Sequence, residues 1–288
     1  MEQKQLFTKS EKGGIYFSIL VALYCVVVFV GQVIINLITV KNTFLYNALF
    51  YLLPLITLLT MVIIYKSKNP KEKLFFANKS NLLKTMPISL IIVFAMFFGL
   101  GFINETVINL FERIGVVAPK NQIVMQNVWQ YLYFVLIIAI LPALLEELVF
   151  RRIITHSFAP LGEVFAILFS GFLFAIYHAS ISQFAYQFIY GAILALLYLK
   201  GKSVLPCILA HFLNNFAVLT FSFFEVSINS HNLAFIISGI FALVISVVAL
   251  SLIKSEKEEK EHKKLNAFLY SLFGVLVCLA LALSVVFM

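Results

Sequence analysis

Nine apolar runs of about twenty residues constrain this chain more than any other feature. A helix needs about 20 apolar residues to cross the hydrocarbon core of a bilayer. The composition agrees, because 62% of the residues are hydrophobic and only 12% are charged, about half the charged share of soluble domains. The sequence therefore predicts an all-α, polytopic transmembrane helical bundle of about nine spans and excludes a soluble domain. The runs are Ile15–Val40, Phe44–Tyr65, Pro87–Leu110, Tyr131–Arg151, Glu163–Ala179, Gln183–Leu199, Val204–Phe224, Leu233–Ile253 and Ala267–Phe287.

Lys and Arg are distributed unevenly between the connecting segments. When these segments are assigned alternately to two sides of a membrane, 18 Lys and Arg residues fall on one side and three on the other. Cytoplasmic loops carry such an excess, so we expect nine spans with a cytoplasmic N-terminus. The net charge of +8 is then explained by the Lys and Arg residues of the cytoplasmic loops, which set the orientation of the spans. We expect a lipid bilayer as partner and no nucleic acid, because no basic stripe is interleaved with stacking aromatics.

Two regions have a less regular pattern. The fifth and sixth runs are short and closely spaced, which favours tilted spans or one helical hairpin. The segment Phe111–Gln130 is predicted to be an interfacial helix on the outer side.

Ionisable residues inside spans mark a candidate functional site, because charge is costly in a membrane. The fourth run ends in LPALLEELVFRR and carries Glu146 and Glu147 within the apolar stretch. Arg151 follows Glu147 by four residues, so the two share a helix face and can form an ion pair. Glu146 is rotated by about 100° from Glu147 and therefore faces a different environment.

Two further runs carry polar groups at helical spacing. Phe174 and His178 lie one turn apart near the end of the fifth run, and His211 and Asn215 lie one turn apart in the seventh. Glu146 and His211 are each placed about five to seven residues from the cytoplasmic ends of their spans, so their depths agree. His178 is placed near the outer end of its span, and it joins them only if that span is tilted or starts deeper.

These groups could together attack an amide with water. A carboxylate in a dry bundle can act as a general base, and a nearby histidine can polarise water or move a proton. A second histidine and an asparagine amide can donate hydrogen bonds to a developing oxyanion. The two-histidine signature HExxH is missing from the sequence, so no motif indicates a zinc site. Two His and two Glu would permit zinc, but we expect no metal and no other cofactor.

Each pair also has a simpler interpretation. Glu147 and Arg151 could form an ion pair at a helix end, and His211 and Asn215 could link helices by hydrogen bonds. His178 could be a histidine at the outer interface. Phe174 is better explained by packing, and Glu105 in the third run by its place near the outer end of the span.

The ordered set of motifs resembles that of the CPBP intramembrane proteases, the CAAX-protease and bacteriocin-processing family, also called Abi. Glu146, Glu147 and Arg151 match its EExxxR motif, Phe174 and His178 its FxxxH motif, and His211 and Asn215 its HxxxN motif. The resemblance covers about Tyr131–Phe224. We therefore divide the chain into N-terminal spans (1–130), a catalytic core (131–224) and C-terminal spans (225–288).

The resemblance implies a glutamate-dependent intramembrane endopeptidase with a peptide or membrane-anchored protein substrate. Bacterial members resemble processing or immunity factors for bacteriocins and pheromones, which implies a multi-pass protein of a bacterial cytoplasmic membrane. Carried over by motif, Glu146 would activate water with help from His178, and His211 and Asn215 would form the oxyanion hole. Glu147 and Arg151 would orient and balance the site. The resemblance also implies that the depth assigned to His178 is wrong.

Two other functions are compatible with the same residues. The chain could be a non-catalytic membrane scaffold or immunity factor that binds a partner protein. Buried Glu and His also form proton relays in transporters, but these commonly show repeated halves with broken helices, and no such symmetry is visible in the sequence.

Overall fold

The computed structural model describes residues 7–38, 43–75, 79–113, 124–226, 229, 231–254, 261 and 264–287. Within these ranges the chain forms helices and no strands, as predicted. In chain order the helices are α1 (Lys9–Ile38), α2 (Thr43–Phe50), α3 (Leu52–Lys68), α4 (Lys79–Phe94), η1 (Ala95–Gly99), α5 (Phe102–Arg113), α6 (Val128–Phe134), η2 (Val135–Ile140), α7 (Leu141–Glu147), η3 (Leu148–Thr155), α8 (His156–Phe158), η4 (Ala159–Leu161), α9 (Glu163–Tyr177), α10 (Ile181–Gly201), α11 (Leu205–Phe223), α12 (Leu233–Ser251) and α13 (Lys264–Phe287).

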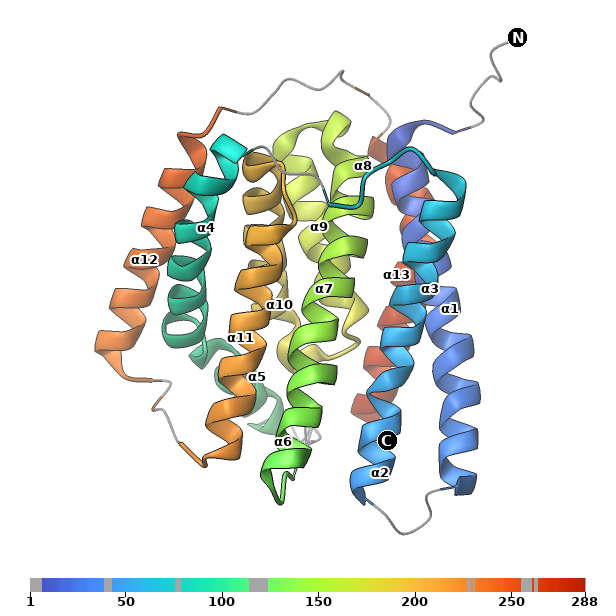
Figure 1. The fold of residues 1–288 in the computed structure, drawn as a ribbon, viewed down its shortest axis with the longest axis vertical. Helices are drawn as coiled ribbons and strands as arrows, with labels where there is room; N and C mark the ends of the chain where they lie inside the picture. Colours follow the sequence, from blue (N-terminus) through green and yellow to red (C-terminus); the bar gives the residue numbers. More distant parts are fainter. Residues whose placement is uncertain are drawn as a thin grey trace.

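The described helices alternate in direction through the bundle, as a polytopic membrane protein requires (Figure 1). Within the described ranges, eight helical stretches are long and apolar enough to cross a membrane. The predicted fifth span, Glu163–Ala179, is the exception, because α9 has only 15 residues. At 1.5 Å per residue it is about 22 Å long, less than the hydrocarbon thickness of about 30 Å. It packs along α10, so the expected helical hairpin is confirmed.

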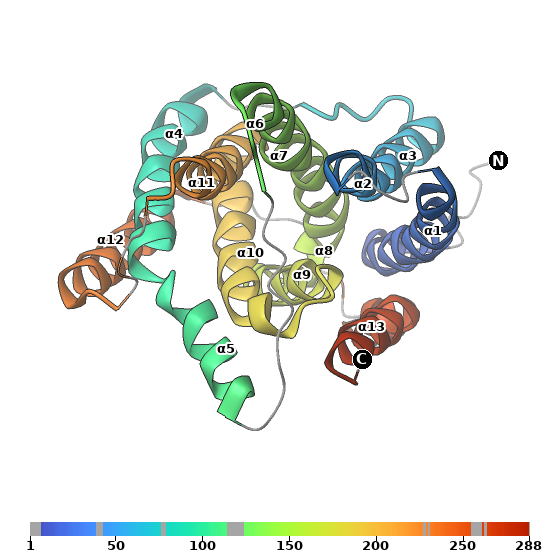
Figure 2. The same cartoon turned by 90° about the horizontal axis from the view of Figure 1, so that it is seen from below.

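The third and fourth predicted spans differ from the sequence-based boundaries. The third is interrupted after η1, where α5 leaves the direction of α4 and packs against α10 (Figure 2). Only the two ends of the predicted interfacial helix, Phe111–Gln130, lie in the described residues; residues 114–123 lie outside them. The fourth span was expected to end at Arg151, but the helical path continues to Leu161. Arg151 and Arg152 are consequently buried rather than placed in a loop.

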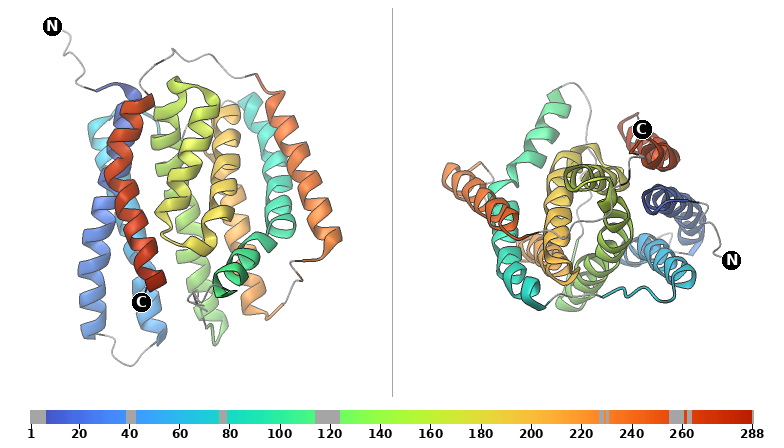
Figure 3. Two further views of the ribbon diagram at one scale, coloured as in Figure 1. Left: turned by 180° about the vertical axis from the view of Figure 1, so that it is seen from behind. Right: turned by 90° about the horizontal axis from the view of Figure 1, so that it is seen from above.

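The described helices form a central group flanked by two others. The central group contains α6 to α11, with α1, α3 and α13 on one side and α4 and α12 on the other (Figure 2, Figure 3). On the second side α12 packs against η1, where Gly99 and Gly239 lie so close that a side chain on either would collide with the other's backbone. On the first side α13 packs against α1. Spans from both ends of the chain therefore enclose the middle region.

Candidate active site

Glu147 is the buried centre of an ion-paired cluster. Its side chain is fully buried, and its Oε2 lies 2.7 Å from Arg151 Nε, one helical turn away. Its Oε1 lies 2.8 Å from His211 Nδ1 on α11. Both carboxylate oxygens are therefore engaged by donors from two different helices. Burying a carboxylate in this way requires such pairing, because an unpaired charge is strongly disfavoured in a low-dielectric interior.

Arg151 connects the fourth span to the α9–α10 hairpin. Its Nη1 donates to the carbonyl oxygen of Gly191 on α10 at 3.1 Å. Its guanidinium carbon lies 4.8 Å from the centre of the Phe174 ring on α9, within the range of a cation–π contact. The predicted pairing with Glu147 is thus present, but deep in the bundle rather than at a helix end.

Glu146 points one carboxylate oxygen at two histidines. Its Oε2 lies 4.0 Å from His178 Nε2 and 3.9 Å from His211 Nε2. This oxygen is buried and has no hydrogen-bond partner among the described residues. Distances near 4 Å are too long for direct hydrogen bonds and suit a shared polar group that bridges the three side chains.

The partner of Nδ1 in each histidine ring shows that this nitrogen carries a proton. His178 Nδ1 lies 2.8 Å from the carbonyl oxygen of Phe174, which can only accept, so Nδ1 carries the proton. His211 Nδ1 in turn donates to the Glu147 carboxylate. Each ring therefore turns its Nε2 toward Glu146, and the second interaction fixes the ring's orientation.

The position of His178 corrects the depth assigned from the sequence. Because α9 is short, the turn after Tyr177 brings His178 Nε2 to within 4.0 Å of Glu146 Oε2. Ala179, the next residue, has a φ of 47°, an uncommon backbone conformation for a residue with a side chain. Glu146 also lies farther from its helix end than expected, since that helix continues to Leu161. The first error treated a short helix as a full span, the second placed a helix end too early, and the three predicted polar pairs still converge.

Asn215 is placed beside the cluster by a different contact. Its Nδ2 donates to the carbonyl oxygen of Ile138 at 3.2 Å. Ile138 lies in the π-helical segment η2, so this hydrogen bond ties α11 to that segment. No described contact joins Asn215 to Glu146, and its oxyanion role remains a prediction.

Gly191 was not identified from the sequence, although its carbonyl holds Arg151. It faces Gly171 on α9, and a Cβ at Gly191 would lie 2.9 Å from Phe174 Cδ1 and 3.2 Å from the Gly171 oxygen. The available signal was the pair of small residues Gly191 and Ala195, four positions apart in an apolar run, which favours close helix packing. Phe174 was expected to pack, and it also contacts Arg151 and His178.

Replacing Gly191 with alanine should therefore destabilise the hairpin. The added methyl must displace Phe174 and the backbone of α9, and overpacking of this kind costs about 1–3 kcal/mol. We expect a lower midpoint of thermal unfolding for the purified protein in detergent. An unchanged midpoint would contradict the close approach of α9 and α10.

The Glu and His side chains of this cluster are also residue types that bind metal ions. A zinc site uses three or more ligands at about 2.0–2.3 Å. Within the described ranges, no group of three or more His, Cys, Asp or Glu residues is placed to hold a metal. Glu147 and the Nδ1 atom of His211 are already committed to each other. The expectation of no metal stays a prediction, and no step below passes through a metal ion.

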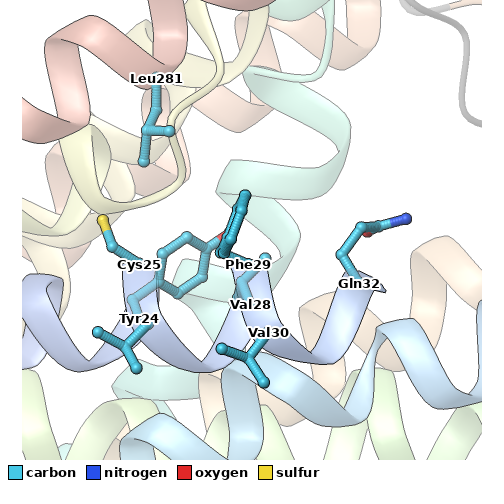
Figure 4. A pocket seen from close by; sticks show the side chains of 8 residues that line it. Tyr24, Cys25, Val28, Phe29, Val30, Gln32 and Leu281 are labelled. Atoms are coloured by element: carbon cyan, nitrogen blue, oxygen red, sulfur yellow. The ribbon is translucent and has the colours of Figure 1, made fainter. Parts of the chain in front are cut away.

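An apolar cavity of about 850 Å³ lies elsewhere, between α1 and α13. Its lining includes Tyr24, Cys25 and Phe29 from α1 and Leu281 from α13 (Figure 4). Tyr24 packs edge-to-face on Tyr177, with ring centres 5.5 Å apart. The cavity lining holds no acidic residue or histidine, so the chemistry described above does not lie within it.

One comparison with known proteins gave a match. Residues 127–217 match the family model described as Rce1-like, type II CAAX prenyl endopeptidase Rce1-like. The matched segment runs from the beginning of α6 into α11 and contains all six predicted site residues. The comparisons with curated proteins and with solved structures found no match.

Proposed function

We propose that this multi-pass membrane protein, a CAAX-type intramembrane protease by family, hydrolyses peptide bonds with a water molecule activated by Glu146. The observation that carries the proposal is the meeting of Glu146 Oε2 with the Nε2 atoms of His178 and His211, at 4.0 and 3.9 Å. The three groups come from α7, the turn after α9, and α11, and one water molecule between them would bridge all three. A general base acts either directly or through one water.

In the proposed reaction, Glu146 takes a proton from the water as its oxygen attacks the peptide carbonyl carbon. The carbonyl oxygen becomes an oxyanion in the tetrahedral intermediate. Glu146 then returns the proton to the leaving nitrogen as the C–N bond breaks, giving a carboxylic acid and an amine. His178 Nε2 lies close enough to hold the water during the transfer.

His211 is proposed to stabilise the oxyanion. Its Nδ1–H is held by Glu147, so an additional proton on Nε2 would make an imidazolium whose second N–H can donate to the oxyanion. With that proton, the charges of Glu146 and Glu147 are balanced by Arg151 and His211. Two negative charges beside two positive ones are less costly to bury than an unbalanced set, which supports a protonated His211 in the resting site. Asn215, one turn along α11, is proposed as the second donor.

The substrate is proposed to be a peptide or a membrane-anchored protein. The side chain of Glu146 is 13% exposed and that of His178 is 21% exposed, so access is narrow and favours an extended chain over a folded domain. We place the protein in a bacterial cytoplasmic membrane with its N-terminus in the cytoplasm. Bacteriocins or peptide pheromones, or a role in self-immunity, would fit that location.

Cleavage by the purified protein tests this function. Wild type and a His178→Ala variant would be reconstituted in lipid and given a quenched peptide library, with and without a chelator. We expect wild-type cleavage that the chelator leaves unchanged, and a kcat reduced by about 10²-fold or more in the variant, because proton transfer contributes effects of that size.

The chelator and the His178→Ala variant test the mechanism, whereas wild-type cleavage tests the function. Loss of wild-type activity with the chelator, restored by added zinc, would replace the metal-free mechanism with a metal-dependent one. Cleavage that survives in His178→Ala would remove this histidine from the mechanism. A wild type that cleaves nothing in the library or among membrane-anchored peptides would contradict the proposed function and favour a non-catalytic scaffold.

A further inference from the structure

We propose that Tyr186 and Asn214 are positioning residues that fix the side-chain amide of Asn215 with its nitrogen toward the reaction site. This inference rests on the proposed function, since it assigns a supporting pair to the oxyanion donor. Neither residue belongs to the three motifs found in the sequence. Asn214 is buried, with 5% of its surface exposed, and Tyr186 is buried on α10.

A continuous chain of hydrogen bonds joins three helices beside the site. The Tyr186 hydroxyl donates to Asn214 Oδ1 at 2.9 Å. Asn214 Nδ2 lies 3.4 Å from Asn215 Oδ1, and Asn215 Nδ2 lies 3.2 Å from the Ile138 carbonyl oxygen. The chain therefore runs from α10 through two neighbouring residues of α11 to η2, the segment just before the one that carries Glu146.

The carbonyl oxygen of Ile138 sets the direction of every bond in this chain. A carbonyl oxygen can only accept a hydrogen bond. Asn215 must therefore present its nitrogen to Ile138 and its oxygen to Asn214. Asn214 must in turn present its nitrogen to Asn215 and its oxygen to Tyr186, so the tyrosine must donate. Reversing either amide would oppose two acceptors or two donors.

This direction matters for catalysis because an amide has a donor end and an acceptor end. The fixed Asn215 uses one of its two N–H bonds on Ile138 and keeps the other for a substrate oxygen. A rotated amide would offer its oxygen instead and would repel an oxyanion. Donors aligned before the reaction contribute most to oxyanion stabilisation, because they need no rearrangement during the chemical step.

The test compares Tyr186→Phe with Tyr190→Phe in lipid. Tyr190 is a matched control, one turn further along α10, buried, with a hydroxyl that has no hydrogen-bond partner among the described residues. We expect Tyr186→Phe to lower kcat about tenfold with KM within twofold of wild type. Tyr190→Phe should leave both parameters within twofold.

A double-variant cycle distinguishes positioning from a general loss of packing. If Tyr186 acts through Asn215, then Tyr186→Phe should have no further effect on kcat in an Asn215→Ala background, because the shared step is already lost. The same tenfold loss in both backgrounds would overturn the proposal. So would an equal loss in Tyr190→Phe.

A second measurement does not depend on activity. In protein labelled with ¹⁵N-asparagine, the side-chain amide signal of Asn215 is identified by its disappearance in Asn215→Ala. We expect this signal to shift in Tyr186→Phe and stay in place in Tyr190→Phe. An unshifted signal in both would overturn the proposal. A shift in a protein that cleaves no peptide would uphold the hydrogen-bond chain and contradict the proposed function alone.

Discussion

Replacing Glu146 with glutamine should abolish most cleavage while the protein still inserts and folds. Glutamine keeps the size of the side chain but cannot accept the proton of the attacking water. The carboxylate oxygen involved has no hydrogen-bond partner among the described residues, so its loss should leave the packing intact. We expect kcat to fall by about 10²–10⁴-fold, the range for removal of a general base, with little change in the thermal unfolding midpoint.

Glu105→Gln provides the control for this prediction. Glu105 lies on α5, where its side chain is 54% exposed beside His231 at 3.5 Å. Exposed pairs contribute little to stability, so both cleavage and unfolding should match wild type. If Glu146→Gln and Glu105→Gln show equal activity, Glu146 is not the base.

Replacing Arg151 with methionine should have the largest effect on stability. It removes the donor 2.7 Å from Glu147 and leaves that carboxylate fully buried with His211 as its remaining partner. Breaking a buried ion pair from one side costs about 3–5 kcal/mol, because the other charge stays in a low-dielectric interior. We expect a much lower unfolding midpoint and a reduced yield of folded protein from membranes.

The double variant Glu147→Gln with Arg151→Met separates stability from catalysis. Removing both charges relieves the uncompensated carboxylate, so most of the lost stability should return. Cleavage should not return, because the neutral amide introduced by Glu147→Gln no longer favours an imidazolium at His211. A double variant as unstable as Arg151→Met alone would show that the arginine stabilises the fold through Gly191 and Phe174 instead of through Glu147.

Much of the site could be predicted because its residues are unusual in their surroundings. Glutamate, histidine and arginine are costly inside apolar helices, so their presence in apolar runs of the sequence already indicates a function. Helical spacing also placed Glu147 and Arg151 on one face, and the structure confirms the pair at 2.7 Å. Span positions already placed Glu146 and His211 at similar depths, whereas the approach of His178 was expected only from the motif set.

Local helix spacing cannot predict the contacts between helices. The orientation of the Asn215 amide depends on Tyr186, 29 positions earlier, and on the carbonyl oxygen of Ile138. The carbonyl that holds Arg151 belongs to Gly191, which carries no side chain and no charge. Tyrosine and glycine are both common in apolar runs. The sequence pattern therefore did not distinguish Tyr186 and Gly191 from ordinary packing residues.

The sequence by itself determined that this chain is a helical membrane protein with ionisable residues in its fourth, fifth and seventh apolar runs. Hydropathy and charge decide those features, because they depend only on the transfer of each segment from water to lipid. The tertiary structure alone decided the depth of the site. The α9 helix stops after 15 residues and the fourth helix continues past Arg151 to Leu161. Both follow from packing between helices, which stabilises a short apolar helix and a buried arginine that hydropathy would not favour.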